Sequence, residues 1–194
     1  MPDGEAKKTC SDTFDYRTLD FDYTQIEGYT EIRLLAWSMG VWVASRVFTG
    51  HSFPWQMKLA VNGTPFPIDD RRGIPKMIFK GTLEHFSEDT LARFRRRMCG
   101  SSGQTEEFLS RTPTRTAEEL REELAALAQG ITAYGSSSFI WDRAIIGNRD
   151  KIFPPRNQHE AWQGTEIMET EAEHYETSLF SRLLEGKGEE WTRH

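Results

Sequence analysis

Three residues of this 194-residue chain have the types and the order of a hydrolytic triad: Ser38, Asp150 and His174. A serine hydroxyl becomes a nucleophile when a histidine takes its proton, and a carboxylate orients that histidine. In one large group of serine hydrolases the three residues follow in this chain order, each on a loop after a strand. The trio therefore predicts hydrolysis of an ester or thioester through an acyl-enzyme.

Ser38 lies in the stretch RLLAWSMGVWVAS, with Ala36 two positions before it and Gly40 two positions after it. A serine presented at the apex of a strained strand-to-helix turn needs small residues at those places. The backbone N–H of Met39, at the start of the following helix, is then the expected oxyanion donor. The alternative is a serine in an ordinary buried turn, where a backbone group satisfies it.

The elements around Ser38 are expected to be a strand at about 32–37, a helix at 39–50 and a second strand at about 57–61. A turn signal at Asn62-Gly63 follows the second strand. Strand, helix and strand in quick succession are typical of a parallel sheet. The chain is therefore predicted to be an α/β protein.

Strands and helices alternate again near the C-terminus. A strand at about 142–146 precedes Asp150, and a last short strand precedes His174. A helix is expected after Pro155, and the closing helix is expected to end at Gly186. Each triad member also has an ordinary alternative, as an ion-paired carboxylate, a helix cap or a surface histidine. The competing residues are Asp69 and Asp70 for the acid, and His51, His85, His159 and His194 for the base.

The middle of the chain reads as helices inserted into the α/β core. Two are expected within 73–100, the second capped by Ser87, and another begins at Thr116 with Glu119 completing a capping box. We expect one domain, 1–194, with residues 70–135 as a helical cap. Its apolar residues either line an acyl tunnel or simply pack: Met77, Ile78, Phe79, Leu83, Phe86, Leu91 and Phe94.

Composition excludes several classes of protein. The net charge is −6, which argues against a general nucleic-acid binder. Two distant cysteines, Cys10 and Cys99, fit neither a disulfide scaffold nor a metal site. The sequence has no apolar stretch of membrane-spanning length and no secretory signal, so we expect a cytoplasmic protein without a membrane partner. It also has no nucleotide or phosphate-binding fingerprint, so no cofactor is predicted.

The blocks DYRTLDFDY, LLAWSMGVWVA, AVNGTPFPIDDRRGIP, RFRRRMCG and AIIGNRDKIFPPRNQHEAW together resemble the BioG family. That resemblance implies an α/β-hydrolase fold, with a mainly parallel sheet, helices on both faces and a helical cap. It also implies a serine esterase that demethylates pimeloyl-[acyl-carrier protein] methyl ester in biotin biosynthesis. Ser38 matches the family nucleophile, Asp150 the acid and His174 the base.

The resemblance gives the basic residues a function as well. Acyl-carrier proteins are strongly acidic, and a basic cap near the site would steer them in. The alternative is a solvated helix face with local ion pairs. The candidate carrier-binding residues are Arg71, Arg72, Arg93, Arg96 and Arg97. Trp37, beside the nucleophile, is the expected wall of the acyl site, or else core filler.

One feature of the family pattern is missing. The family resembles other α/β hydrolases in having an earlier strand and a Gly-Trp-Gly-type loop that supplies a second oxyanion amide. The residues before Tyr16 contain neither, so a second donor is expected to be absent. Loss of one donor costs about 10²–10³ in rate. The alternatives are therefore an esterase or thioesterase for another substrate, or an impaired hydrolase-like protein that binds acyl-carrier protein.

Overall fold

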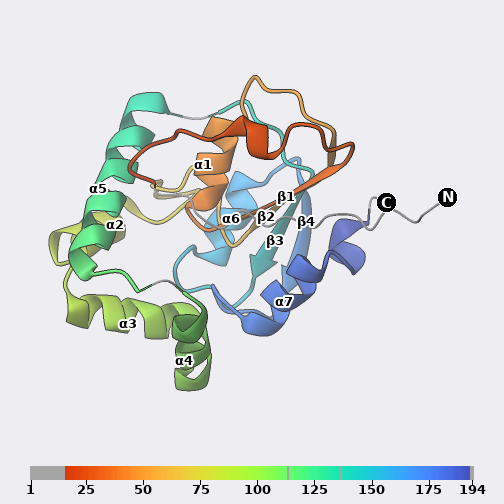
Figure 1. The fold of residues 1–194 in the computed structure, drawn as a ribbon. Helices are drawn as coiled ribbons and strands as arrows, with labels where there is room; N and C mark the ends of the chain where they lie inside the picture. The colour runs from red at the N-terminus through yellow and green to blue at the C-terminus, as the bar shows by residue number, and fades with distance from the viewer. Residues whose placement is uncertain (1–15, 113, 136, 193–194) are drawn as a thin grey trace.

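A parallel sheet of four strands forms the centre of the protein (Figure 1). The computed structural model describes residues 16–192 apart from 113 and 136. The strands lie side by side in chain order: β1 (Ile32–Trp37), β2 (Trp55–Val61), β3 (Arg143–Gly147) and β4 (Glu166–Thr170). The expected mainly parallel sheet is therefore confirmed.

Helices cover both faces of this sheet. Side chains alternate along β1, so that Leu34 and Ala36 face α1 (Gly40–Val47), while Leu35 and Trp37 face α7 (Thr177–Glu185). The helix α6 (Pro155–Ala161) follows β3, and Trp162 at its end packs on the α1 side. The sheet thus lies between two apolar layers, and β3 at its centre is buried throughout, which is typical of parallel sheets.

Four helices stand between β2 and β3 in the chain: α2 (Lys76–Glu84), α3 (Glu88–Cys99), α4 (Ser102–Arg111) and α5 (Ala117–Tyr134). Figure 1 shows them grouped to one side of the sheet, and all lie within residues 70–135. Of these four helices, α4 was not expected from the sequence. Its start is rich in glycine and serine, yet the hydroxyl of Ser101 accepts from the N–H of Gln104 and caps it.

The helix ends follow the expected local chemistry. Ser87 caps α3 and Thr116 caps α5, each in a capping box; Glu119 is the second member at α5. The closing helix α7 stops at Gly186, which has φ +68°. None of the helices in the described part of the chain has the length and apolarity needed to cross a bilayer.

Two short 3₁₀ turns complete the described chain, Tyr23–Gln25 and Glu189–Trp191. The second turn is held against the sheet by Arg143 of β3, whose side chain is fully buried. Its guanidinium donates to the carbonyls of Glu189 (2.6 Å), Glu190 (2.8 Å) and Thr192 (2.8 Å). These bonds fix the last segment against β3, and the carboxylate of Glu166 pairs with the buried guanidinium at 2.7 Å.

Candidate active site

Ser38 lies at a sharp turn between β1 and α1. Its φ is +57°, in the left-handed region that a residue with a side chain seldom adopts. Its N–H donates to the carbonyl of Val61 (3.0 Å), and its own carbonyl accepts from the N–H of Val41 (3.2 Å). The hydroxyl is thus presented on a strained turn, as the small neighbours Ala36 and Gly40 predicted.

Two glycines lie at places near this turn where a Cβ atom would clash with a neighbouring residue, and the sequence did not reveal these contacts. A Cβ at Gly63, after β2, would lie 2.1 Å from the carbonyl oxygen of Ser38. A Cβ at Gly40 would lie 2.9 Å from the hydroxyl of Tyr16. The nearest obstacle at position 40 is therefore Tyr16, and not Ala36 as the turn pattern suggested.

Ser38, His174 and Asp150 form one hydrogen-bonded chain. Nε2 of His174 lies 3.0 Å from Oγ of Ser38, and Nδ1 lies 2.9 Å from Oδ2 of Asp150. His174 is 1% exposed and Asp150 is 4% exposed. With its Nδ1 proton donated to the carboxylate, the neutral imidazole leaves Nε2 to accept the serine proton.

The Asp150 carboxylate is fully engaged. Its Oδ1 accepts the backbone N–H groups of Ile152 (2.7 Å) and Phe153 (2.9 Å). Its Oδ2 accepts from Nε2 of the buried Gln158 at 3.1 Å, in addition to His174. The carboxylate is therefore fixed in one orientation toward His174. Gln158 was not expected from the sequence, because a glutamine on a helix carries no pattern that marks such a contact.

The imidazole of His174 has two aromatic neighbours. Phe153 is parallel to it, with 4° between the planes and 5.9 Å between centroids, and Trp37 lies 5.2 Å away. The indole N–H of Trp37 donates to the backbone carbonyl of His174 (2.9 Å). Trp37, expected to wall the acyl site, is not among the residues that line the cavity. It supports the histidine loop instead.

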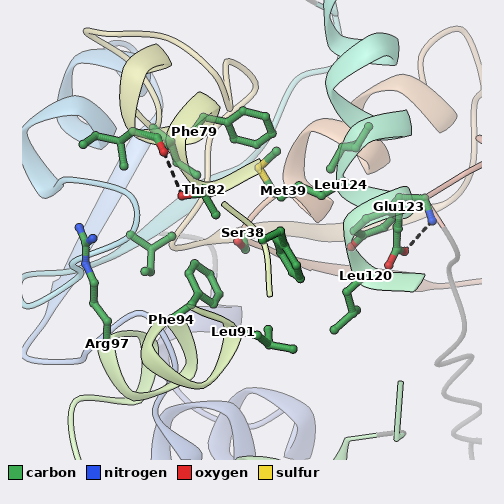
Figure 2. A pocket seen from close by; sticks show the side chains of 16 residues that line it. Ser38, Met39, Phe79, Thr82, Leu91, Phe94, Arg97, Leu120, Glu123 and Leu124 are labelled. Atoms are coloured by element: carbon green, nitrogen blue, oxygen red, sulfur yellow. Dashed lines mark hydrogen bonds between the residues drawn. The ribbon is translucent and has the colours of Figure 1, made fainter. Parts of the chain in front are cut away.

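An apolar cavity of about 240 Å³ opens beside Ser38 (Figure 2). Five of the seven apolar residues suggested for an acyl tunnel line it: Ile78, Phe79, Phe86, Leu91 and Phe94. The other two lie elsewhere, because Met77 is 75% exposed and Leu83 borders a separate groove against α5. Leu120, Leu124 and Leu127 of α5 complete the apolar wall.

Polar groups stand at the edge of this cavity. Oε1 of Glu123 accepts the backbone N–H of Tyr16 (2.8 Å), and Oε2 receives the guanidinium of Arg115. Burial and the nearby Glu123 carboxylate raise the pKa of Tyr16 to about 12. Arg97 also lines the cavity, and Figure 2 shows it on the opposite side from Glu123.

The backbone N–H of Met39 is the oxyanion donor expected from the sequence. Met39 lines the cavity beside Ser38, and its N–H donates to no residue in the described part of the chain. The expected absence of a second oxyanion donor concerns the residues before Tyr16. Those residues, 1–15, lie outside the described ones.

The competing acids and bases lie apart from the triad. The Asp69 carboxylate accepts the N–H groups of Arg71 (3.0 Å) and Arg72 (2.9 Å), and Asp70 accepts the N–H of Lys76 (2.9 Å). Among the histidines, His51 and His85 are exposed, and His159 faces Glu169 at 3.4 Å. His194 lies outside the described residues.

The candidate carrier-binding arginines are not equivalent. Arg97 donates to the carbonyl of Lys151 at the cavity, and Arg93 and Arg96 are exposed on α3. Arg71 is paired with Glu160 of α6 (2.7 Å), and Arg72 with Asp69 (3.3 Å). Arg97 alone among the five is placed at the cavity beside Ser38.

Comparison with known families matches residues 4–185 to the model described as "Pimeloyl-ACP methyl esterase BioG". The matched range includes Ser38, Asp150 and His174. A Bacteroides fragilis protein named malonyl-[acyl-carrier protein] O-methyltransferase is 49% identical over 173 residues, which are 88% of this chain and 35% of that protein. An uncharacterized Haemophilus influenzae protein is 44% identical over 87% of this chain and 77% of its own length. The chain therefore spans about a third of the first of these relatives.

Solved structures agree with the family match. The crystal structure of selenomethionine BioG from Haemophilus influenzae has a TM-score of 0.78 and 43% identity, covering 86% of this chain and 77% of its own. A thermophilic esterase from Thermogutta terrifontis has a TM-score of 0.56 and 13% identity, covering 84% of this chain and 65% of its own. The latter likeness shows the fold alone, which is that of an α/β hydrolase.

Proposed function

The chain belongs to the BioG family, and on that premise we propose that it is a serine carboxylester hydrolase acting on pimeloyl-[acyl-carrier protein] methyl ester in biotin synthesis. One observation carries the proposal. The hydroxyl of Ser38 lies 3.0 Å from a histidine nitrogen, and the other nitrogen of that ring lies 2.9 Å from a buried carboxylate. An apolar cavity begins at the same hydroxyl.

The geometry supports a two-step acyl transfer. Ser38 Oγ attacks the ester carbonyl carbon while Nε2 of His174 takes the hydroxyl proton. The Met39 N–H donates to the oxyanion that forms. The bond to the methoxy oxygen then breaks, and His174 returns the proton so that methanol leaves. Water attacks the acyl-enzyme with His174 again as base, which releases the free carboxylic acid and restores Ser38.

The cavity supports an aliphatic acyl chain as the group held during this reaction. Its wall is built from leucine, isoleucine and phenylalanine side chains, which gain contact with methylene groups by excluding water. Arg97 adds a cation at the edge of the same cavity. We propose that Arg97, with the exposed Arg93 and Arg96 on α3, attracts the acidic acyl-carrier protein that presents the chain.

Methyl transfer is the activity in the name of the Bacteroides fragilis relative. We propose hydrolysis for this chain instead, because a serine, a histidine and a carboxylate in hydrogen-bonded sequence are the groups that an acyl-enzyme requires. The chain covers 35% of that relative, so the name describes a much longer protein.

The direct test is labelling of Ser38. A fluorophosphonate should add once to the wild-type protein, as read by intact mass, and both Ser38→Ala and His174→Ala should abolish the adduct. Ser110→Ala, on the exposed face of α4, is the matched control and should label normally. The same set is then assayed for methanol released from carrier-bound pimeloyl methyl ester. A wild-type protein that is folded but does not label would refute the proposal.

A further inference from the structure

We propose that Asn62 is a positioning residue that sets the location of His174 relative to Ser38. This inference rests on the proposed function, because it concerns the same triad. Asn62 is 1% exposed and stands directly after β2, where the sequence indicated only a turn.

Both N–H donors and the oxygen of the Asn62 carboxamide form hydrogen bonds, and each contact is to the backbone of a segment near the triad. Nδ2 donates to the carbonyls of Glu173 (3.0 Å) and His174 (2.9 Å). Oδ1 accepts the N–H of Gly147 (2.7 Å), the last residue of β3. One carboxamide therefore joins the end of β2 to the end of β3 and to the loop that carries the histidine.

The backbone of the same turn lies against the nucleophile. Gly63 follows Asn62 and approaches the carbonyl of Ser38 so closely that a Cβ would come within 2.1 Å. The N–H of Ser38 donates to the carbonyl of Val61, on the other side of Asn62 (3.0 Å). The turn thus touches the serine through its backbone and the histidine loop through its side chain.

A second donor converges on the same carbonyl. The indole N–H of Trp37, one residue before Ser38, donates to the carbonyl of His174 at 2.9 Å. The histidine backbone is therefore held by one group from the β1 side and one from the β2 side. Both groups act on His174 without touching the reacting atoms, which defines positioning rather than catalytic residues.

The left-handed backbone at Asn62, with φ +46°, does not by itself explain the asparagine. Aspartate and glycine also tolerate that conformation. Only the carboxamide supplies two donors for the carbonyls and one acceptor for the Gly147 N–H at once. Asn62→Asp keeps the shape and the acceptor for Gly147 but puts a carboxylate oxygen in place of both donors, so it breaks the contacts to the histidine loop.

The experiment compares Asn62→Asp and Trp37→Phe with Trp141→Phe. The control removes a buried indole N–H bond of the same kind, from Trp141 to the hydroxyl of Ser45 (2.9 Å), within the core beside α1. For each folded variant we measure the thermal midpoint, the rate of fluorophosphonate labelling, and kcat and KM on a methyl ester. The double variant Asn62→Asp/Trp37→Phe tests whether the two donors act on one carbonyl.

We expect Asn62→Asp to slow labelling and lower kcat by about 10²-fold, with KM nearly unchanged, since small misplacements of catalytic groups have effects of that size. Trp37→Phe should act in the same direction but less, and the double variant should lose less than the product of the two single losses. Trp141→Phe should lower the thermal midpoint alone. If Asn62→Asp does not fold, the contrast between Trp37→Phe and Trp141→Phe decides.

Two negative results are distinguishable. A wild-type protein that labels, with Asn62→Asp and Trp37→Phe labelling as fast as Trp141→Phe, would overturn the inference and leave the proposed function intact. A folded wild-type protein that does not label would overturn both.

Discussion

The hydroxyl of Tyr16 lies beside the Cα atom of Gly40, so close that a Cβ on residue 40 would come within 2.9 Å of it. Gly40 opens α1, two residues after Ser38. Tyr16, which lines the cavity, and the first residue of α1 are therefore packed against each other. Tyr16 cannot yield freely, because it is half-buried and its backbone N–H is bonded to Glu123.

Gly40→Ala is therefore expected to destabilise the protein by about 1–3 kcal/mol, as overpacking typically does. Gly81→Ala is the matched control in α2, where a Cβ meets nothing within 4 Å; it should stabilise by about 0.5–1 kcal/mol through helix propensity. Urea unfolding measures both, and Tyr16→Phe should restore part of the loss at Gly40. Equal gains at the two glycines would contradict the packing argument.

Ionisation of Tyr16 should also lower the stability of the protein at alkaline pH. Burial and Glu123 raise its pKa to about 12, above the unfolded value of about 10. A raised pKa means that its contribution to stability is complete below pH ~10 and is lost as the pH rises toward ~12. The free energy of unfolding should thus fall more steeply over that interval in wild type than in Tyr16→Phe. Parallel curves would show that Tyr16 makes no such contribution.

Gln158 should affect kcat because its side chain holds the carboxylate of Asp150 in place. Its Nε2 donates to Oδ2 of Asp150 (3.1 Å) and to the carbonyl of Phe153 (2.8 Å). Gln158→Met removes both bonds at similar volume, so we expect kcat to fall about tenfold or more and stability to fall by about 1–3 kcal/mol. Gln163→Met, an exposed position after α6, is the control for the substitution itself. Equal kcat values in the two variants would show that Asp150 needs no such support.

Filling the cavity should select against long acyl chains. Ile78 lines the cavity, whereas its neighbour Met77 is 75% exposed and does not. Ile78→Trp should raise KM for a long-chain methyl ester more than for an acetyl ester, and Met77→Trp should change neither. The ratio of kcat/KM values for the two esters measures this directly. An unchanged ratio in Ile78→Trp would place the acyl chain outside the cavity.

Charge reversal at the cavity should separate carrier-bound from free substrates. Arg97→Glu should reduce kcat/KM for carrier-bound methyl ester by about tenfold or more at low salt, since rim charges act mainly on association. The loss should shrink as salt is added, because screening weakens the attraction. Arg111→Glu, on α4, is the control and should have little effect. If Arg97→Glu impairs small esters equally, Arg97 serves the cavity and not the carrier.

The sequence predicted the parts of the fold that local chemistry dictates. Alternating or continuous apolar runs marked β1 to β4, and hydroxyl caps at Ser87 and Thr116 marked α3 and α5. It also identified Ser38, Asp150 and His174, which the structure brings into hydrogen-bond contact. The order of loops after parallel strands was enough for this, because such loops meet at one edge of the sheet.

Contacts made across the fold were not predictable in this way. Gln158 and Asn62 each make more than one buried hydrogen bond, to partners outside the element or turn in which they stand. Neither residue type is rare on a helix or in a turn, so no local pattern distinguishes them. Trp37 was placed near the site by its position beside Ser38, but only the packing of α7 and the histidine loop decides which way its ring points.

The order of the strands has a consequence for when the protein becomes reactive. Each strand pairs with the one before it in the chain, and the base that activates Ser38 arrives last, 136 residues later. Contacts so distant in sequence form slowly, because the intervening chain must first be ordered. Under the proposed mechanism Ser38 would have no base until then, so esterase activity would report that the last strand and the His174 loop have folded.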